Sequence, residues 1–198
     1  MLSEIVSILD SWDKTLTVML NFDGGPIADI SAVCLSSRII WLLWGILFVY
    51  RLFHIYGHDT RRIVAALLGL VVVIVLCDQI SSSVLKPLVG RLRPSHDEAV
   101  CHMLHYVGSY RGGLYGFVSS HAANAFGASV YCMKFFKEKT FALSLPAFAA
   151  FVGYSRIYLG VHYFGDVLCG ALLGICIGLI LSKTVTTYCL NRLKLTLP

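Results

Sequence analysis

The chain has 198 residues, of which 57% are hydrophobic and 14% are charged, and its mean hydropathy is +0.76. These values exclude an ordinary soluble domain and indicate an integral membrane protein. The net charge of +5 does not indicate nucleic-acid binding, because the sixteen Lys and Arg residues are scattered among apolar segments. No linker, low-complexity stretch or repeat divides the sequence, which predicts a single membrane domain over residues 1–198.

Residues 1–22 predict an amphipathic helix that lies in the membrane interface. Apolar side chains recur there at helical spacing, opposite polar ones such as Asp10, Asp13 and Thr17. The alternative is a weakly apolar first spanning helix. The segment lacks the basic start and the cleavage site of a signal peptide, so we expect it to be retained. Residues 21–26 (NFDGGP) then end the helix.

The remaining apolar segments predict an all-α, polytopic transmembrane bundle of about five spans. The predicted spans cover residues 36–56, 62–85, 118–136, 141–159 and 163–183. The first has the shortest apolar run and depends on Arg38 and Arg51 reaching the two interfaces.

Positive charges predict the orientation of this bundle. With a cytoplasmic C-terminus, nine lie on the inner side: Arg51, Arg61, Arg62, Lys134, Lys137, Lys139, Lys183, Arg192 and Lys194. Seven lie on the outer side: Lys14, Arg38, Lys86, Arg91, Arg93, Arg111 and Arg156. Three of these seven belong to the polar clusters described next and are poor topology signals, so the comparison of nine with four favours this orientation. The loops at 86–118 and 156–162 then face the outside of the cell membrane.

Three polar clusters interrupt the apolar sequence. They are Lys86 with Arg93, Ser119 with Ser120 and His121, and Arg156 with His162 and Asp166. The predicted topology places all three on the outer face. Cations, histidines and a carboxylate are costly to bury in a membrane protein, and their convergence favours a phosphoryl-transfer site for an anionic lipid.

The last cluster is the most informative, because His162 and Asp166 are four residues apart and share one face of a helix. The carboxylate can hold one ring nitrogen and leave the other as a nucleophile or base. A metal site is the competing use of such a pair, and a histidine at the interface is the simplest explanation of the pair alone. Nearby Lys and Arg would repel a cation and no third ligand lies at a suitable spacing, so we expect no metal or other cofactor.

The middle cluster lies at the predicted start of a helix, where serine is a natural N-cap. The free N–H groups and the helix dipole form an anion site there. His121 can donate a proton to a departing alkoxide while Lys86, Arg93 and Arg156 neutralise charge on the phosphate oxygens.

The three clusters together resemble, in order and spacing, the signature motifs of the type 2 phosphatidic acid phosphatase superfamily of membrane lipid phosphatases, over about residues 60–183. The resemblance implies metal-independent catalysis in which His162 forms a phosphohistidine, Asp166 orients it and His121 protonates the leaving group. It implies these phosphate ligands: Lys86, Arg93, Ser119, the backbone of Ser120, and Arg156.

Two departures from the family pattern lie in the middle motif, where Pro-Ser-Gly-His is usual and this chain has Val118-Ser119-Ser120-His121. Unlike glycine, Ser120 does not readily adopt a positive φ, so this loop need not have the backbone geometry of the family pattern. Because the serine keeps its backbone donor, we still expect Ser120→Gly to leave activity within an order of magnitude.

The substrate is less well specified, because loops and grooves select the lipid. The small size and outer active face resemble bacterial envelope phosphatases of the inner membrane, which implies lipid A phosphate, undecaprenyl diphosphate, phosphatidylglycerol phosphate or phosphatidate as substrate. Polar side chains of the loop at 95–117 either contact a headgroup or are simply solvated: His96, His102, His105, Tyr106, Tyr110, Arg111 and Tyr115. The alternative functions are a catalytically silent lipid-phosphate sensor, a transporter and a vanadium haloperoxidase.

Three further features have structural interpretations. Asp78 requires a partner within the membrane, and either Arg38 pairs with it or it positions Lys86. Gly170, Gly174 and Gly178 recur every four residues, which favours close helix packing within a monomer over a dimer interface. Seven cysteines lie mostly in apolar runs, and among them only a bond between Cys34 and Cys101 is conceivable.

Overall fold

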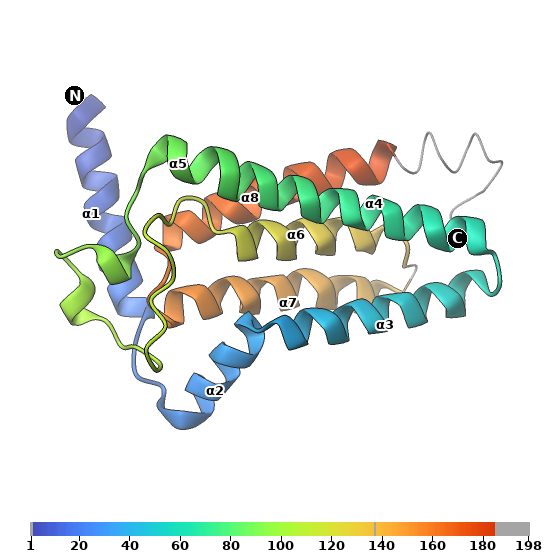
Figure 1. Ribbon diagram of the computed structural model, residues 1–198, viewed down its shortest axis with the longest axis horizontal. Helices are drawn as coiled ribbons and strands as arrows, with labels where there is room; N and C mark the ends of the chain where they lie inside the picture. Colours follow the sequence, from blue (N-terminus) through green and yellow to red (C-terminus); the bar gives the residue numbers. More distant parts are fainter. Residues whose placement is uncertain (1, 137, 185–198) are drawn as a thin grey trace.

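The computed structural model describes residues 2–136 and 138–184, and this part of the chain forms helices without any strand. The all-α prediction is therefore confirmed. Five long helices run side by side along the long axis of the molecule (Figure 1). They are α3 (Arg38–Tyr56), α4 (Thr60–Asp78), α6 (Ser120–Met133), α7 (Lys139–Tyr158) and α8 (Phe164–Thr184).

Four stretches of the described chain are long and apolar enough to cross a membrane: Arg38–Tyr56, Thr60–Val89, Thr140–Tyr158 and Phe164–Thr184. A bent pair of helices near the N-terminus would make a fifth, so the number agrees with the predicted five or so. The segment at 118–136 was predicted to span the membrane, and it does not form a spanning helix. Its helix α6 has 14 residues, about 21 Å at 1.5 Å per residue, and is too short to cross the membrane alone.

Helix α6 instead forms the centre of the bundle, packed by α4, α7 and α8. Small residues allow this close approach. A Cβ atom on Gly170 would lie 2.5 Å from the Ser119 carbonyl oxygen, and one on Gly178 would lie 2.6 Å from the Gly127 carbonyl oxygen. Gly174 faces the Ala123 carbonyl in the same way. The predicted packing of the glycine stripe within the monomer is confirmed.

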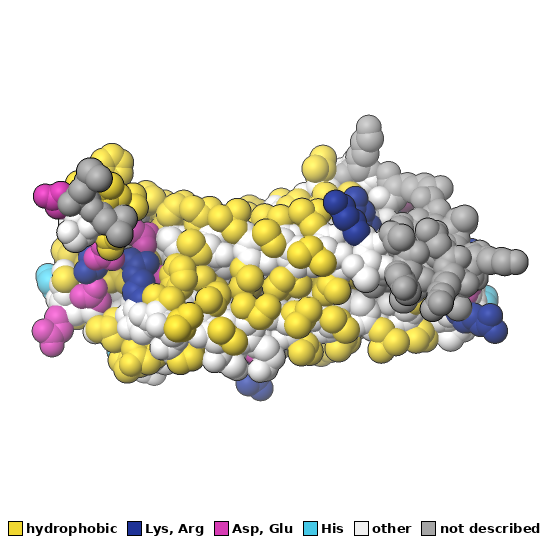
Figure 2. All heavy atoms as spheres, turned by 90° about the horizontal axis from the view of Figure 1, so that it is seen from above, with side chains coloured by type: hydrophobic (Ala, Val, Ile, Leu, Met, Phe, Trp, Pro, Cys, Tyr) yellow, Lys and Arg dark blue, Asp and Glu magenta, His cyan; other side chains and the backbone are white. Residues whose placement is uncertain are grey.

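The bundle carries an apolar flank and a polar end. Figure 2 shows hydrophobic side chains covering the flank, with acidic and basic side chains gathered at the end where α1 lies. Apolar side chains exposed along the whole length of a bundle indicate contact with lipid. The chain is thus a multi-pass membrane protein.

Helix α1 (Leu2–Leu20) stands across this polar end of the bundle rather than alongside the other helices (Figure 1). Its apolar side is exposed, with Trp12 at 75% and Met19 at 70%. These observations agree with the predicted interfacial helix. The polar side of α1, however, faces the protein, as described below.

Several short elements complete the fold. Helix α2 (Gly25–Ser36), which the sequence analysis left unassigned, follows α1 after a bend of 119°. A π-helix (Gln79–Leu85) continues α4 into the short α5 (Lys86–Val89). Two 3₁₀ turns, Pro94–His96 and Cys101–Met103, lie in the loop before α6.

Two pairings that the sequence left open are not formed. Asp78 accepts a hydrogen bond from the Ser82 hydroxyl at 3.5 Å, and no ion pair of the described residues joins it to Arg38. Cys34 and Cys101 are both free thiols.

The orientation of the bundle stays a prediction. Three of the charges used for it, Lys137, Arg192 and Lys194, lie outside the described residues, as does the side chain of Lys139.

Candidate active site

His162 lies in the turn between α7 and α8, at the polar end of the bundle, and is 1% exposed. Its Nε2 atom is 3.0 Å from Nη1 of Arg93. A guanidinium can only donate, so Nε2 accepts and the ring proton resides on Nδ1. Nδ1 faces Oδ2 of Asp166 at 3.5 Å, without forming a hydrogen bond. The predicted pair is therefore adjacent, and the lone pair of Nε2 points toward the cations.

The electrostatics of the site favour a neutral imidazole. Burial lowers the pKa of His162 well below its ordinary value, and the charges of Arg93, Arg156 and Lys86 lower it further, with a smaller contribution from His121. These four residues belong to the three sequence clusters. Direct contacts also join the clusters: Arg93 lies 3.0 Å from Nε2 of His162, Lys86 donates to Oγ of Ser120 at 2.8 Å, and the Ser119 amide donates to the Asp166 carbonyl at 2.9 Å. The structure therefore brings all three clusters together.

Arg93 and Arg156 are buried, and among the described residues no carboxylate is a hydrogen-bond partner of either side chain. Arg93 donates from Nε to the Tyr115 carbonyl at 3.1 Å and from Nη1 to the Val161 carbonyl at 3.0 Å. Arg156 is 2% exposed, reaches the Tyr110 hydroxyl at 3.4 Å, and its Nε has no hydrogen-bond partner among the described residues. Buried cations with unused donors provide a site for an anionic group.

Ser119 caps α6, as predicted. Its Oγ accepts a hydrogen bond from the amide of Ala122 at 3.4 Å, and its own amide donates to the Asp166 carbonyl at 2.9 Å. The N-terminus of α6 is thus attached to the first turn of α8. His121 lies two residues further along, in the first turn of α6.

Ser120 makes contacts that the sequence analysis did not anticipate. Its Oγ accepts hydrogen bonds from Nζ of Lys86 and from Oγ of Ser81, both at 2.8 Å. Ser81 is fully buried and belongs to the π-helix that precedes Lys86. Ser120 is the first residue of α6, so its right-handed helical backbone does not require glycine. The side chain of Ser120 therefore fixes the ammonium group of Lys86.

Ser120→Gly removes this hydrogen bond, and we expect kcat/KM to fall by about five- to tenfold, the usual cost of one hydrogen bond. Phosphate-release kinetics of the purified variant measure the change. Ser120→Ala is the matched control, since it removes the hydroxyl without adding backbone freedom. An unchanged Ser120→Ala enzyme beside an impaired Ser120→Gly enzyme would assign the effect to the backbone instead.

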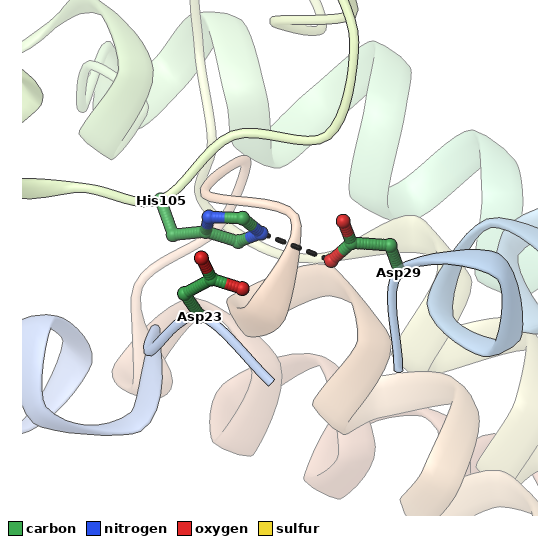
Figure 3. A group of neighbouring side chains, drawn as sticks. All are labelled: Asp23, Asp29 and His105. Carbon is green, nitrogen blue, oxygen red and sulfur yellow. Dashed lines mark hydrogen bonds and ion pairs between the residues drawn. The ribbon is translucent and has the colours of Figure 1, made fainter. Parts of the chain in front are cut away.

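The polar loop residues separate into two groups. Tyr110 contacts Arg156 and so belongs to the site. His105 is structural: its Nε2 lies 2.9 Å from Oδ1 of Asp29 on α2 (Figure 3). Asp23 lies beside them. Each of the three residues offers one atom that could bind a metal ion, a carboxylate oxygen or a ring nitrogen, and these atoms lie within 4.8 Å of one another. Because the Tyr158 hydroxyl also donates to Asp29, at 2.6 Å, this group connects the loop to α2 and α7.

Arg91 lies at the site although the sequence did not predict it there. In the sequence analysis Arg91 appears only among the positive charges that indicate the orientation of the bundle. Its Nη1 lies 3.0 Å from Oδ1 of Asp166. The spacing of two residues between Arg91 and Arg93 carries no recognisable signal, since both face the site only through the loop geometry.

The sequence and the fold of this chain match those of known proteins. The PAP2 superfamily matches residues 63–188. The lipid A 4'-phosphatase of Porphyromonas gingivalis is 32% identical over 166 residues, covering 84% of this chain and 70% of that protein. The lipid A 4'-phosphatase of Bacteroides thetaiotaomicron is 30% identical over 171 residues, covering 86% and 75%.

Two solved structures share the fold. A PAP2-type phosphatidylglycerolphosphate phosphatase from Bacillus subtilis has a TM-score of 0.65 at 20% identity, covering 89% of this chain and 85% of that one. Aquifex aeolicus LpxE has a TM-score of 0.59 at 23% identity, covering 85% and 93%. With the family match spanning more than half of the sequence, the chain belongs to the PAP2 superfamily and is a membrane lipid phosphatase.

Proposed function

We propose that this enzyme removes the 4'-phosphate of lipid A at the outer face of a bacterial inner membrane, without a metal ion and through a phosphohistidine on His162. The observation that carries the chemistry is the buried Nε2 lone pair of His162 among three cations. The two lipid A 4'-phosphatases at 32% and 30% identity support the choice of substrate.

Phosphate binding prepares the nucleophile. Arg93 donates to Nε2 of His162 in the free enzyme. A bound phosphate oxygen would accept this N–H instead and release the lone pair for attack. Arg156 has a free buried donor, and Lys86 is held at the N-terminus of α6 by Ser120. Together these groups would neutralise the charge on the equatorial oxygens of the transition state.

The reaction then follows in two displacements. Nε2 of His162 attacks phosphorus, the phosphorus–nitrogen bond forms and the ester bond to the lipid breaks. His121, which the charge of the bound phosphate group would keep protonated, gives its proton to the departing alkoxide. Asp166 stabilises the positive imidazolium at Nδ1. A water molecule next attacks phosphorus while His121 takes its proton. The phosphorus–nitrogen bond breaks, and inorganic phosphate leaves.

The substrate assignment predicts phosphate release from lipid A by the detergent-purified enzyme in the presence of EDTA. Undecaprenyl diphosphate and phosphatidylglycerol phosphate are tested in parallel, with mass spectrometry to locate the phosphate that remains on lipid A. His162→Ala serves as the blank. His54→Ala is the matched control, since His54 is exposed in the last turn of α3, far from the site.

Each outcome of this experiment is informative. Release from another lipid alone would retain the chemistry and reject lipid A. Loss of the 1-phosphate would reject the 4' assignment, and inhibition by EDTA that a divalent cation reverses would reject the metal-free mechanism. A folded enzyme that binds these lipids and releases no phosphate would favour the silent sensor.

A further inference from the structure

We propose that Arg91 is a positioning residue for Asp166 and that the N-terminal helix α1 holds Arg91 in place. This inference rests on the proposed roles of His162 and Asp166. It assigns the polar side of α1 a function in catalysis, in addition to its place in the membrane interface.

Arg91 is surrounded by carboxylates. Its Nη1 lies 2.8 Å from Oδ2 of Asp13 and 3.0 Å from Oδ1 of Asp166, while its Nη2 lies 2.9 Å from Oδ1 of Asp10. The guanidinium also lies over the ring of Tyr163, 4.1 Å from its centroid. A planar group bound along two edges and covered on a face has a fixed orientation.

The contact with Arg91 uses one of the two oxygens of Asp166 and so directs the other. Oδ1 accepts from Arg91, whereas Oδ2 accepts from the amide of Tyr163 at 3.1 Å and faces Nδ1 of His162 at 3.5 Å. Asp166 is fully buried. A Cβ atom on Gly116 would lie 2.6 Å from Oδ2, so the carboxylate is tightly enclosed on that side. Without Arg91, nothing among these contacts would hold Oδ1.

Helix α1 is attached to the same segment by two further contacts. Oδ1 of Asp13 accepts the amide of Gly165 at 2.7 Å, and Oγ1 of the fully buried Thr17 accepts the amide of Phe164 at 3.0 Å. These amides open α8 and would otherwise lack partners. Side chains of α1 therefore cap α8 from outside, next to Asp166.

The polar side of α1 faces the protein, which distinguishes α1 from a helix that only anchors the chain to the membrane. Acidic residues of an interfacial helix ordinarily face water, but Asp10 and Asp13 face Arg91 while Trp12 is turned outward. A groove of about 1040 Å³ is lined by part of the apolar side of α1 together with Phe117 and Leu168. Arg91 therefore connects the position of α1 to the orientation of the Asp166 carboxylate.

Arg91→Gln tests the proposal with the lipid that the parent enzyme hydrolyses. We expect kcat to fall by about 10- to 100-fold, as for loss of a charge-assisted hydrogen bond, with KM changed much less. Asp13→Asn should give a smaller fall in kcat. The matched control is Arg62→Gln, which removes a comparable ion pair with Asp59 at the opposite end of the bundle and should leave kcat unchanged.

A double-mutant cycle separates positioning from general destabilisation. If Arg91 acts through Asp166, Arg91→Gln adds no loss to an Asp166→Asn enzyme. Multiplied losses would overturn the proposal, as would a fall in kcat matched by the Arg62→Gln control.

A measurement without substrate keeps this test independent of the proposed function. ¹⁵N NMR of the histidine rings, assigned with His162→Ala, should show the His162 Nδ1 signal moving in Arg91→Gln and not in Arg62→Gln. An unmoved signal would overturn the inference. A parent enzyme that hydrolyses no lipid phosphate while this signal moves would overturn the proposed function alone.

Discussion

Replacing His162 with alanine is expected to lower phosphate release by more than about a thousandfold while leaving the protein folded, because the variant lacks the proposed nucleophile of the two-step reaction. The ring of His162 is buried, and its Nε2 lone pair meets only Arg93. Phosphate-release kinetics of both proteins, with thermal unfolding in detergent as the check on folding, measure this effect.

The covalent intermediate gives a direct test of the same assignment. Lipid carrying ³²P, mixed with parent enzyme and quenched in alkali, should leave label on the protein that is lost on treatment with acid, the behaviour of a phosphoramidate. The label should be missing from His162→Ala and present in His54→Ala. Label that persists in folded His162→Ala would assign the nucleophile to another residue.

His121→Gln is expected to slow lipid hydrolysis by about 10²- to 10⁴-fold, the range for loss of a general acid. The alkoxide of a sugar or glycerol is a poor leaving group and requires the proton. An aryl phosphate does not, because its phenolate leaves readily. The variant should therefore retain a rapid first burst of phenol release from an aryl phosphate, even though its steady-state turnover is slow. Stopped-flow absorbance measures the burst.

The burst distinguishes proton donation from phosphate binding. If His121 mainly holds the phosphate, the burst is lost along with lipid turnover. His96→Gln is a suitable control, since His96 lies in the loop before α6 and contacts the Gly112 carbonyl at 3.5 Å. A His121→Gln enzyme with equal losses on both substrates would contradict the acid role.

The sequence predicts what depends on short spacings. Ser119 caps a helix because a serine precedes a helical segment. His162 and Asp166 are adjacent, as their spacing predicts, but His162 lies in the turn before α8 and the two residues do not share a helix face. Gly170 and its repeats predict close packing by the same kind of local argument. The class of the protein follows from composition alone. The roles of the individual site residues remain proposals that the geometry supports.

Other features depend on contacts that no local pattern encodes. The bond between Ser120 and Lys86 requires the π-helical register of residues 79–85, which hydrophobic periodicity does not reveal. The partner of the polar side of α1 could not be predicted, because an amphipathic pattern is the same whether Asp13 meets solvent or Arg91. The shortness of α6 was missed because apolar residues continue beyond its end, to Phe136.

The capping of α8 by α1 has a consequence for the order in which the enzyme becomes active. The amide of Gly165 and the carboxylate of Asp13 are separated by 152 positions in the chain. During synthesis, α1 would emerge and reach the membrane long before its partner exists, and contacts of such high sequence separation form late in folding. Attachment of Asp166 to α1 through Arg91 would then be among the last steps of assembly. On the roles proposed above, a chain in which α1 has not yet docked would bind lipid phosphates before it could cleave them.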